Sequence, residues 1–161
     1  MVKALRSTAG RAPDGLADAV MAEVGLVDSW TEIEGPIGPL FVAWGASGIT
    51  AAERSGDATG FETEYELRHG RPLRRVYEMP ERMRAQVQKR FEGERTEGPP
   101  LDLDTLTEFE QAVLIKTMEI PYGEVRPYSW VAREVGRPRA VRAVGSALAG
   151  NPITFVIPCH R

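Results

Sequence analysis

Residues 128–150 read YSWVAREVGRPRAVRAVGSALAG and carry the strongest structural signal in this chain. Residues 128–135 have the composition of a short helix that Gly136 would end, and a second helix is predicted from about residue 139 to 149, ended by Gly150. Two helices joined by a short, glycine-containing turn form the helix-turn-helix outline. The outline alone is weak evidence of DNA binding, because helix pairs of this kind occur throughout α-rich proteins.

The composition of the second helix strengthens the case for a polymer partner. It consists almost wholly of small residues around Arg142, so its backbone could approach another polymer closely while the guanidinium projects. From residue 121 to the end there are six arginines against two glutamates, and arginine suits bidentate contact with phosphate. Two alternatives stay open: a salt bridge from Arg142 to Glu134, and a solvated positive face without a partner.

Composition sets the broad class of protein. A chain of 161 residues with 42% apolar content can form one ordinary domain or two small ones. Its net charge of -3 argues only weakly against nucleic acid. One cysteine cannot form an internal disulfide and, with two histidines, is too poor a set for a thiolate zinc site, so no metal is expected. With no apolar run of membrane-spanning length, we expect a soluble, cytoplasmic protein without a membrane partner.

The rest of the C-terminal half offers two further signals. Thr107-Glu-Phe-Glu110 has the form of a capping box that opens an apolar helix, which stops at Ile120-Pro121. Residues 152–158 are an apolar, β-branched run closed by proline, and Cys159 and His160 follow directly. The pattern predicts a buried strand that delivers a thiol to the rim of a site, with an imidazole beside it.

The N-terminal half is predicted to be a compact α/β unit. Residues 35–52 read as strand, glycine-rich turn and strand, and residues 60–68 and 80–93 as helices. Residues 92–102 are polar and rich in glycine and proline, as in a linker. We therefore expect an α/β fold: a small N-terminal α/β domain with an antiparallel sheet (1–98) and a C-terminal helical, winged-helix-like domain (99–161). Residues 1–34 mix a short amphipathic helix with glycine and proline and have no clear placement.

Five ordered blocks carry a family resemblance: Ile120-Pro-Tyr-Gly-Glu-Val, Tyr128-x-x-Val-Ala, Arg142-Ala-Val-Gly, Asn151-Pro and Ile157-Pro-Cys-His-Arg. Together they resemble the O6-alkylguanine-DNA alkyltransferase family. The spacings fit that family, with Arg142 lying 14 residues after Tyr128 and 17 residues before Cys159. The family signature lies in residues 107–161, and the preceding region is compatible with the family's small N-terminal domain without a specific motif.

The resemblance implies DNA repair by a suicide methylated-DNA–protein-cysteine S-methyltransferase without a cofactor. Cys159 would be the acceptor: its thiolate would displace guanine from the alkyl carbon of O6-alkylguanine, with O4-alkylthymine as a further substrate. A thioether is not readily hydrolysed, so each molecule would react once. A free thiol is mostly protonated at neutral pH, and His160 resembles the family's base. Neighbouring residues of an extended strand point in opposite directions, so the proton would travel through a bridging water.

The resemblance also assigns the DNA contacts. The partner would be double-stranded DNA containing O6-alkylguanine, bound by a monomer, with the damaged nucleotide rotated out of the stack. Arg142 would fill the gap, and the small residues Ala143, Gly145 and Ser146 would let its helix lie in the minor groove. Tyr128 would turn the target phosphate and donate a proton to the departing guanine, although it could simply be a packed aromatic. Asn151 would tie together the turn before the thiol, although Asn-Pro is also ordinary turn chemistry.

The sequence departs from the family pattern at two places. Pro127 stands where Ser or Thr is usual, which removes a backbone donor. Family members continue past Cys-His-Arg with a Val, a Gly-rich segment and a Glu-bearing helix, and this sequence stops at Arg161. We therefore expect a truncated alkyltransferase. The alternatives are a non-catalytic helix-turn-helix protein that binds DNA or alkyl lesions, and an unrelated winged-helix module in which Cys159 is merely buried.

Overall fold

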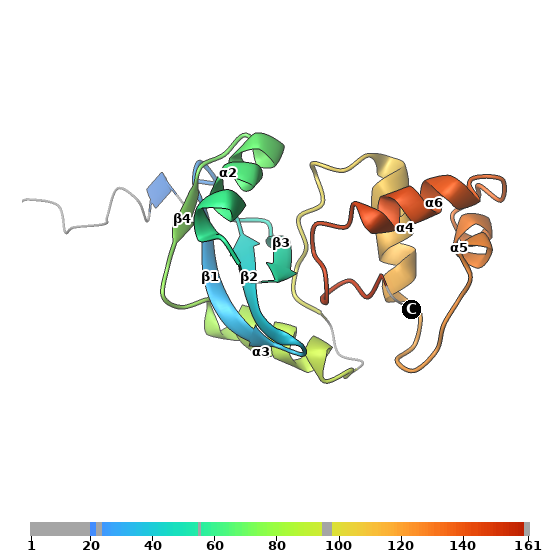
Figure 1. The fold of residues 1–161 in the computed structure, drawn as a ribbon, viewed down its shortest axis with the longest axis horizontal. Coiled ribbons are helices and arrows are strands. Elements are labelled where there is room, and N and C mark those ends of the chain that lie inside the picture. The colour runs from blue at the N-terminus through green and yellow to red at the C-terminus, as the bar shows by residue number, and fades with distance from the viewer. Residues whose placement is uncertain (1–19, 22–23, 55, 95–97, 160–161) are drawn as a thin grey trace, which may run out of the picture.

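The computed structural model describes residues 20–21, 24–54, 56–94 and 98–159. Its elements run in the order β1 (Asp28–Gly35), β2 (Gly38–Trp44), β3 (Ile49–Arg54), α2 (Ala58–His69), β4 (Leu73–Arg75), α3 (Glu81–Phe91), α4 (Glu108–Met118), α5 (Tyr128–Glu134) and α6 (Val141–Ala149). We call β1 to α3 the sheet unit and residues 98–159 the helical unit. Figure 1 shows the three helices of the helical unit grouped beside the β3 edge of the sheet. The predicted boundary after residue 98 stays a prediction.

The four strands form one sheet in the order β3-β2-β1-β4. The predicted hairpin is β2 and β3, which pair antiparallel, and β1 adds to β2 in the same sense. The expectation of an antiparallel sheet holds for these three strands, whereas the short β4 pairs with β1 in parallel. Strand β1 was not predicted, because it lies largely in the N-terminal stretch that has no clear sequence pattern. Of the amphipathic helix suggested there, Val20 and Met21 are helical and exposed, and its earlier residues lie outside the described ranges.

The predicted helices are present with shifted ends. Helix α2 begins earlier than predicted, because Asp57 caps it by accepting a hydrogen bond from the Thr59 N–H at 3.1 Å. It ends at Gly70, whose φ of 66° is the left-handed conformation that glycine adopts without strain. In α4 the predicted capping box is confirmed: the Thr107 N–H donates to Glu110 Oε2 at 2.9 Å and the Glu110 N–H donates to Thr107 Oγ1 at 3.3 Å. No described helix combines the length and apolar content needed to cross a membrane.

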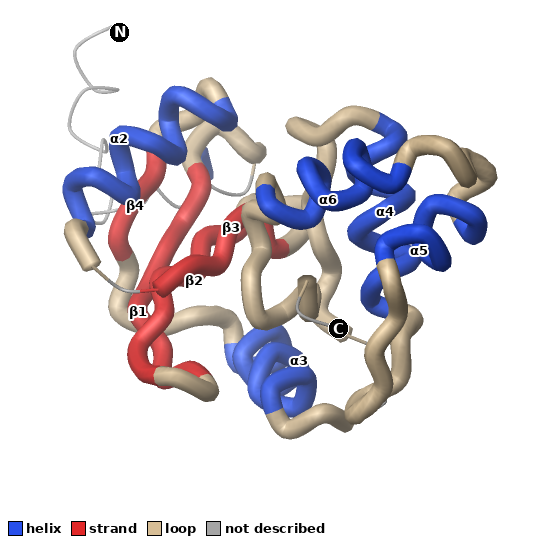
Figure 2. Tube along the Cα trace, turned by 45° about the vertical axis from the view of Figure 1, so that its right-hand side comes forward, coloured by secondary structure: helices blue, strands red, loops and turns tan. Residues whose placement is uncertain are grey.

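The two faces of the sheet bury different cores. On one face, aromatic residues of the sheet pack against α2, with Trp30 at the centre in edge-to-face contact with Phe41 and Phe61. On the other face, Val42 and Ala52 join a larger core that takes in α3, α4, α5 and α6. We call this the main core, and Figure 2 shows the sheet lying between α2 and the helices that contribute to it. The sheet unit and the helical unit therefore share one apolar interior.

The edge strand β3 is covered by two segments of the helical unit. The Ile49 N–H donates to Pro100 O at 2.9 Å, and the Asp102 N–H donates to Ile49 O at 2.8 Å. Further along, the Ala52 N–H donates to Pro152 O at 2.8 Å, and Ala52 O accepts from the Thr154 N–H at 2.9 Å. An open strand edge presents unpaired N–H and C=O groups, so these bonds complete the sheet and fix the helical unit against it.

A polar network is buried beside this junction. The Tyr65 hydroxyl donates to Asp28 Oδ2 at 2.5 Å and shares a hydrogen bond with Thr50 Oγ1 at 2.8 Å. Arg71 lies between two carboxylates, with Nε 3.1 Å from Asp28 Oδ2 and Nη2 3.6 Å from Asp102 Oδ2. Because Asp102 belongs to the segment that leads into α4, the network ties the sheet to the entry of the helical unit. Burial, followed by the hydrogen bond to Asp28, raises the pKa of Tyr65, so the hydroxyl keeps its proton.

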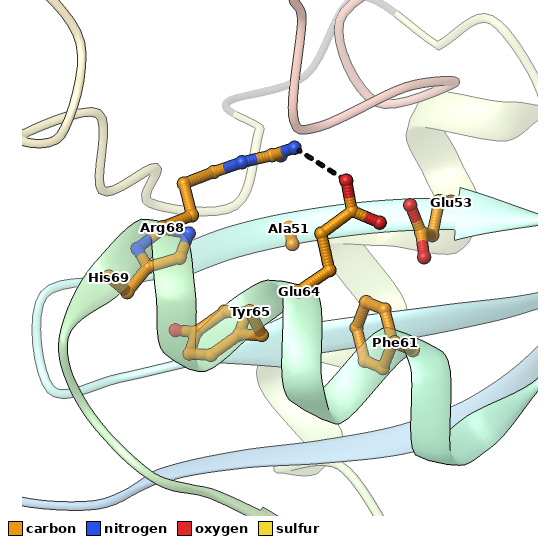
Figure 3. Close-up of a pocket in the computed structure, with 7 residues that line it drawn as sticks. All are labelled: Ala51, Glu53, Phe61, Glu64, Tyr65, Arg68 and His69. Atoms are coloured by element: carbon orange, nitrogen blue, oxygen red, sulfur yellow. Dashed lines mark hydrogen bonds and ion pairs between the residues drawn. The ribbon is translucent and has the colours of Figure 1, made fainter.

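His69 lies at the rim of the same network. Its ring stacks on Tyr65, with the centroids 4.1 Å apart, and Figure 3 shows the two neighbouring side chains on α2. Neither ring nitrogen has a hydrogen-bond partner among the described residues. Burial and the nearby charges of Arg71 and Arg68 lower the pKa of His69, which favours the neutral imidazole. His69 therefore serves as a packed aromatic here, and it lies on the opposite side of the sheet from the main core.

We predict that Tyr65→Phe destabilises the protein. The substitution keeps the ring but leaves the buried Asp28 carboxylate without its hydroxyl donor, which costs about 1–3 kcal/mol. Urea denaturation would measure the loss. Tyr77→Phe, at a fully exposed side chain, is the matched control and should leave the free energy of unfolding unchanged. Equal stabilities of the two variants would contradict a structural role for the network.

Candidate active site and nucleic-acid interface

Residues 151–159 form an irregular turn that ends at the thiol, and we call them the thiol turn. The prediction of a regular strand here is wrong. The segment has only isolated bridges, from Ile153 to Ala52 and between Thr154 and Ile157. Phe155 interrupts the extended backbone with a φ of 68°, and the Val156 N–H donates to Thr154 O across it at 2.8 Å. A left-handed conformation at a bulky residue is strained and persists only where surrounding contacts hold it.

Asn151 bridges the two ends of the thiol turn. Its side chain is almost fully buried, and Oδ1 accepts from the Ile153 N–H at 3.0 Å. Nδ2 donates to Ile157 O at 3.1 Å. Its own N–H donates to Leu148 O, in the last turn of α6, at 3.3 Å. Through its backbone N–H and its side chain together, Asn151 thus connects the end of α6 to the backbone immediately before the thiol.

Cys159 is half-buried and packs against the main core. Its N–H donates to Ile157 O at 2.9 Å, the same carbonyl that Asn151 holds. The thiol is therefore attached to a short backbone segment whose position is set by buried hydrogen bonds. His160, which the resemblance makes the base, lies outside the described residues, as does Arg161.

Tyr128 and Gly145 bring the two helices of the helix-turn-helix together. Tyr128 is the first residue of α5, and the Pro127 before it provides no side-chain cap. The ring lies against α6 so closely that a Cβ at Gly145 would be 3.3 Å from Tyr128 Cε2. The Tyr128 hydroxyl makes no hydrogen bond within the described part of the chain, and the side chain is 44% exposed. Tyr128 is thus packed along one face and open along the other, so both roles considered for it are compatible with its position.

Helix α6 has an apolar face and a polar face. Val144, Ala147 and Leu148 are buried in the main core. The outer face carries Arg142, Ala143, Ser146 and Ala149, which are all exposed. The side chains beside Arg142 are small, so another polymer could approach the helix backbone there. The proposed ion pair with Glu134 is not formed, and Arg142 contacts no other carboxylate of a described residue.

Further arginines lie on α5 and in the connection that leads into α6. Arg133, Arg137 and Arg139 are exposed, and none pairs with a carboxylate in the described ranges. Arg126 differs, because its guanidinium forms an ion pair with Glu124 and lies over the ring of Trp130, 5.7 Å from the centroid. The unpaired charges give the helix-turn-helix a positive surface, which is the electrostatic requirement for binding a phosphate backbone.

The structure brings the predicted site residues together in two groups. Tyr128 meets α6, which carries Arg142, and Asn151 meets the backbone that carries Cys159; no hydrogen bond joins Tyr128 to Cys159.

Two features of the thiol turn were not predicted. One is the strained backbone at Phe155, and the other is Arg90 of α3, whose guanidinium reaches the turn from 66 residues away. Neither has a local sequence signal, since both depend on how distant segments meet.

The fold and the site define a helix-turn-helix protein with a reactive-thiol candidate at the end of the turn that follows its second helix. A family model described as "6-O-methylguanine DNA methyltransferase, DNA binding domain" matches residues 108–161. A methylated-DNA–protein-cysteine methyltransferase of Mycobacterium leprae is 38% identical over 135 residues, covering 80% of this chain and 74% of the relative. A crystal structure of Mycobacterium tuberculosis OGT in complex with DNA aligns with a TM-score of 0.65 and 34% identity, over 83% of this chain and 76% of that one. The chain belongs to the methylated-DNA–protein-cysteine methyltransferase family, as the resemblance predicted.

The extent of the match varies among relatives. A probable methylated-DNA–protein-cysteine methyltransferase of Acanthamoeba polyphaga mimivirus is 43% identical over 76 residues, which are 47% of this chain and 51% of the viral protein. The chain therefore spans about half of that relative and about three quarters of the M. leprae protein. Similarity to the M. leprae protein and to the M. tuberculosis structure extends into the sheet unit, which supports the predicted α/β fold as a whole.

We predict that Asn151→Ala destabilises the protein by about 2–4 kcal/mol, since the Ile153 N–H loses its buried acceptor and Ile157 O loses one of its two donors. Chemical denaturation would measure the change. Ser146→Ala, which removes an exposed hydroxyl from α6, is the control and should stay within about 0.5 kcal/mol of the unmodified protein. A loss no larger than that of the control would show that the thiol turn does not depend on Asn151.

Proposed function

We propose that this protein repairs alkylated DNA by transferring the alkyl group of O6-alkylguanine to Cys159, once per molecule. The observation that carries the proposal is the placement of the only cysteine. It ends a buried, hydrogen-bonded turn that follows directly from the exposed, arginine-bearing helix α6. The names of the relatives, which are methylated-DNA–protein-cysteine methyltransferases, support the same activity.

The reaction is a substitution at the alkyl carbon. The Cys159 thiolate forms the S–C bond while the bond from that carbon to guanine O6 breaks, and the departing guanine takes up a proton. The product is S-alkylcysteine and unmodified guanine. His160 would accept the thiol proton through a water, and Tyr128 would donate toward the guanine; both roles rest on the family resemblance. The Tyr128 hydroxyl supports its part, because no described residue forms a hydrogen bond with it and the side chain is open along one face.

DNA binding is assigned to the outer face of α6. Arg142 would enter the space left by the rotated nucleotide, and Ala143 and Ser146 would face the minor groove. Gly145 has a different part in this proposal: it makes room for the Tyr128 ring and so keeps that side chain next to the groove-facing helix. The partner is duplex DNA bound by a monomer, and we place the protein in the cytoplasm because its lone cysteine needs no oxidising compartment.

The alternative of a DNA-binding protein that transfers nothing is less well supported. Under this alternative Cys159 has no function, although the side chains of Asn151 and Arg90 both hold the strained turn that ends at it. A merely buried thiol is also less favoured, since the side chain is half-exposed. Both alternatives remain outcomes of the transfer experiment.

We predict that incubation with a duplex containing O6-methylguanine adds one methyl group to the peptide that carries Cys159. Intact-mass and peptide-mass measurements would detect it, since a thioether survives the analysis. The same duplex with ordinary guanine, and a Cys159→Ser variant, should give no addition. Binding of the methylated duplex by a folded protein whose mass does not change would favour the non-catalytic alternative instead.

We predict that Arg142→Ala slows methyl transfer by at least about tenfold, because nothing then fills the vacated stack. Single-turnover kinetics on the methylated duplex would give the rate. Arg82→Ala removes the same charge from an exposed position on α3 and should transfer at the unmodified rate. If the two variants transfer equally fast, Arg142 does not assist rotation of the nucleotide.

A further inference from the structure

Arg90 of α3 reaches from the sheet unit into the helical unit. Its Nε donates to Val156 O at 3.3 Å, and its Nη2 donates to Met118 O at 3.3 Å. The guanidinium is partly buried, and its rigid fork can serve two acceptors at once. One side chain of the sheet unit therefore holds two separate backbone segments of the helical unit.

The first of these segments is the thiol turn. Within the turn, Ile153 O accepts from the Ile157 N–H, Thr154 O accepts from the Val156 N–H, and Ile157 O accepts from Cys159 and Asn151. The donor to Val156 O comes instead from Arg90. Val156 is fully buried, so its carbonyl would lose an essential partner without the guanidinium.

The second segment is the end of α4. The last carbonyls of a helix have no partner within the helix and carry partial negative charge, so a cation is favoured there. Lys116 O and Thr117 O are satisfied by the N–H groups of Glu119 and Ile120. Met118 O is satisfied by Arg90. The guanidinium thereby sets the separation between the end of α4 and the thiol turn.

We propose that Arg90 is a positioning residue for Cys159, acting across the two units. Val156 directly follows Phe155, whose left-handed backbone needs external contacts to persist. Asn151 fastens the turn from within the helical unit, and Arg90 fastens it from the sheet unit at the adjacent carbonyl. Without Arg90, Phe155 can relax, and the thiol of Cys159, four residues further on, moves from its place. The consequence for alkyl transfer rests on the proposed function, whereas the ordering of the turn does not.

The test compares Arg90→Met and Arg90→Lys with Arg84→Met. Methionine keeps an apolar stem without donors, and lysine offers one donor group in place of the fork. Arg84 is an exposed residue of the same helix whose side chain makes no ion pair or hydrogen bond to a described residue. Amide hydrogen exchange of residues 153–159 and of the strands β1 to β3 would be measured in the full chain, together with single-turnover methyl transfer and duplex affinity.

For Arg90→Met we expect exchange in residues 153–159 to accelerate by at least about tenfold while the strands stay protected. Methyl transfer should slow by about 10- to 100-fold, since small displacements of a reacting group have effects of this size. Duplex affinity should stay within about twofold, since Arg90 lies outside the DNA-binding face. Arg90→Lys should fall between the unmodified protein and Arg90→Met, and Arg84→Met should match the unmodified protein.

Two results would overturn the inference: exchange at 153–159 equal to that of Arg84→Met, or equal acceleration in the strands, which would mean a general loss of stability. If the unmodified protein transfers no methyl group, the proposed function fails. The exchange comparison still decides whether Arg90 orders the thiol turn.

Discussion

The pair of backbone hydrogen bonds at Ala52 joins the sheet to the thiol turn, and the placement of the candidate site depends on it. Ala52 lies on the edge strand β3, where its N–H and C=O would otherwise meet solvent. Pro152 and Thr154 satisfy both groups, and the Thr154 hydroxyl adds a third bond to Ala52 O at 2.5 Å. Beneath these bonds the main core continues from the sheet into α4, α5 and α6. The thiol therefore takes its position from the sheet as well as from the helices that carry the positive surface.

Features with local causes could be predicted from the sequence. The capping box at Thr107 and Glu110 places the start of α4, and glycines end α2 and α5, because these signals act over a few residues. The path of residues 152–158 was predicted wrongly for the opposite reason. Their β-branched, apolar composition favours a strand, but the sheet offers them a partner at Ala52 alone, and the chain turns at Phe155 to bring the thiol back toward the core. The composition of residues 152–158 correctly indicates that the segment is buried, but it does not determine the path of the backbone.

The candidate site also has parts that could be predicted from the sequence and parts that could not. The five sequence blocks were enough to identify the family. Asn151 lies in the turn that its Asn-Pro sequence indicates, and Arg142 is exposed on the helix of small residues. The contribution of Arg90 could not be predicted. No local sequence pattern connects an arginine on a largely polar helix with the carbonyl of Val156, 66 residues further along the chain. The roles of Tyr128 and His160 toward a substrate remain predictions. They concern contacts with DNA, and the folded chain contains only the protein side of each contact.

The interior shared by the two units limits how this protein could be recombined with its relatives. The family model matches residues 108–161, which suggests a module that could be exchanged by itself. A chimaera made by grafting only that segment would lose the fitted side chains of β2 and β3, the partner of Pro152 at Ala52, and the guanidinium from α3. The unit that can be exchanged between relatives is thus larger than the segment that contains the reactive residues. A working chimaera must include the sheet that packs against that segment.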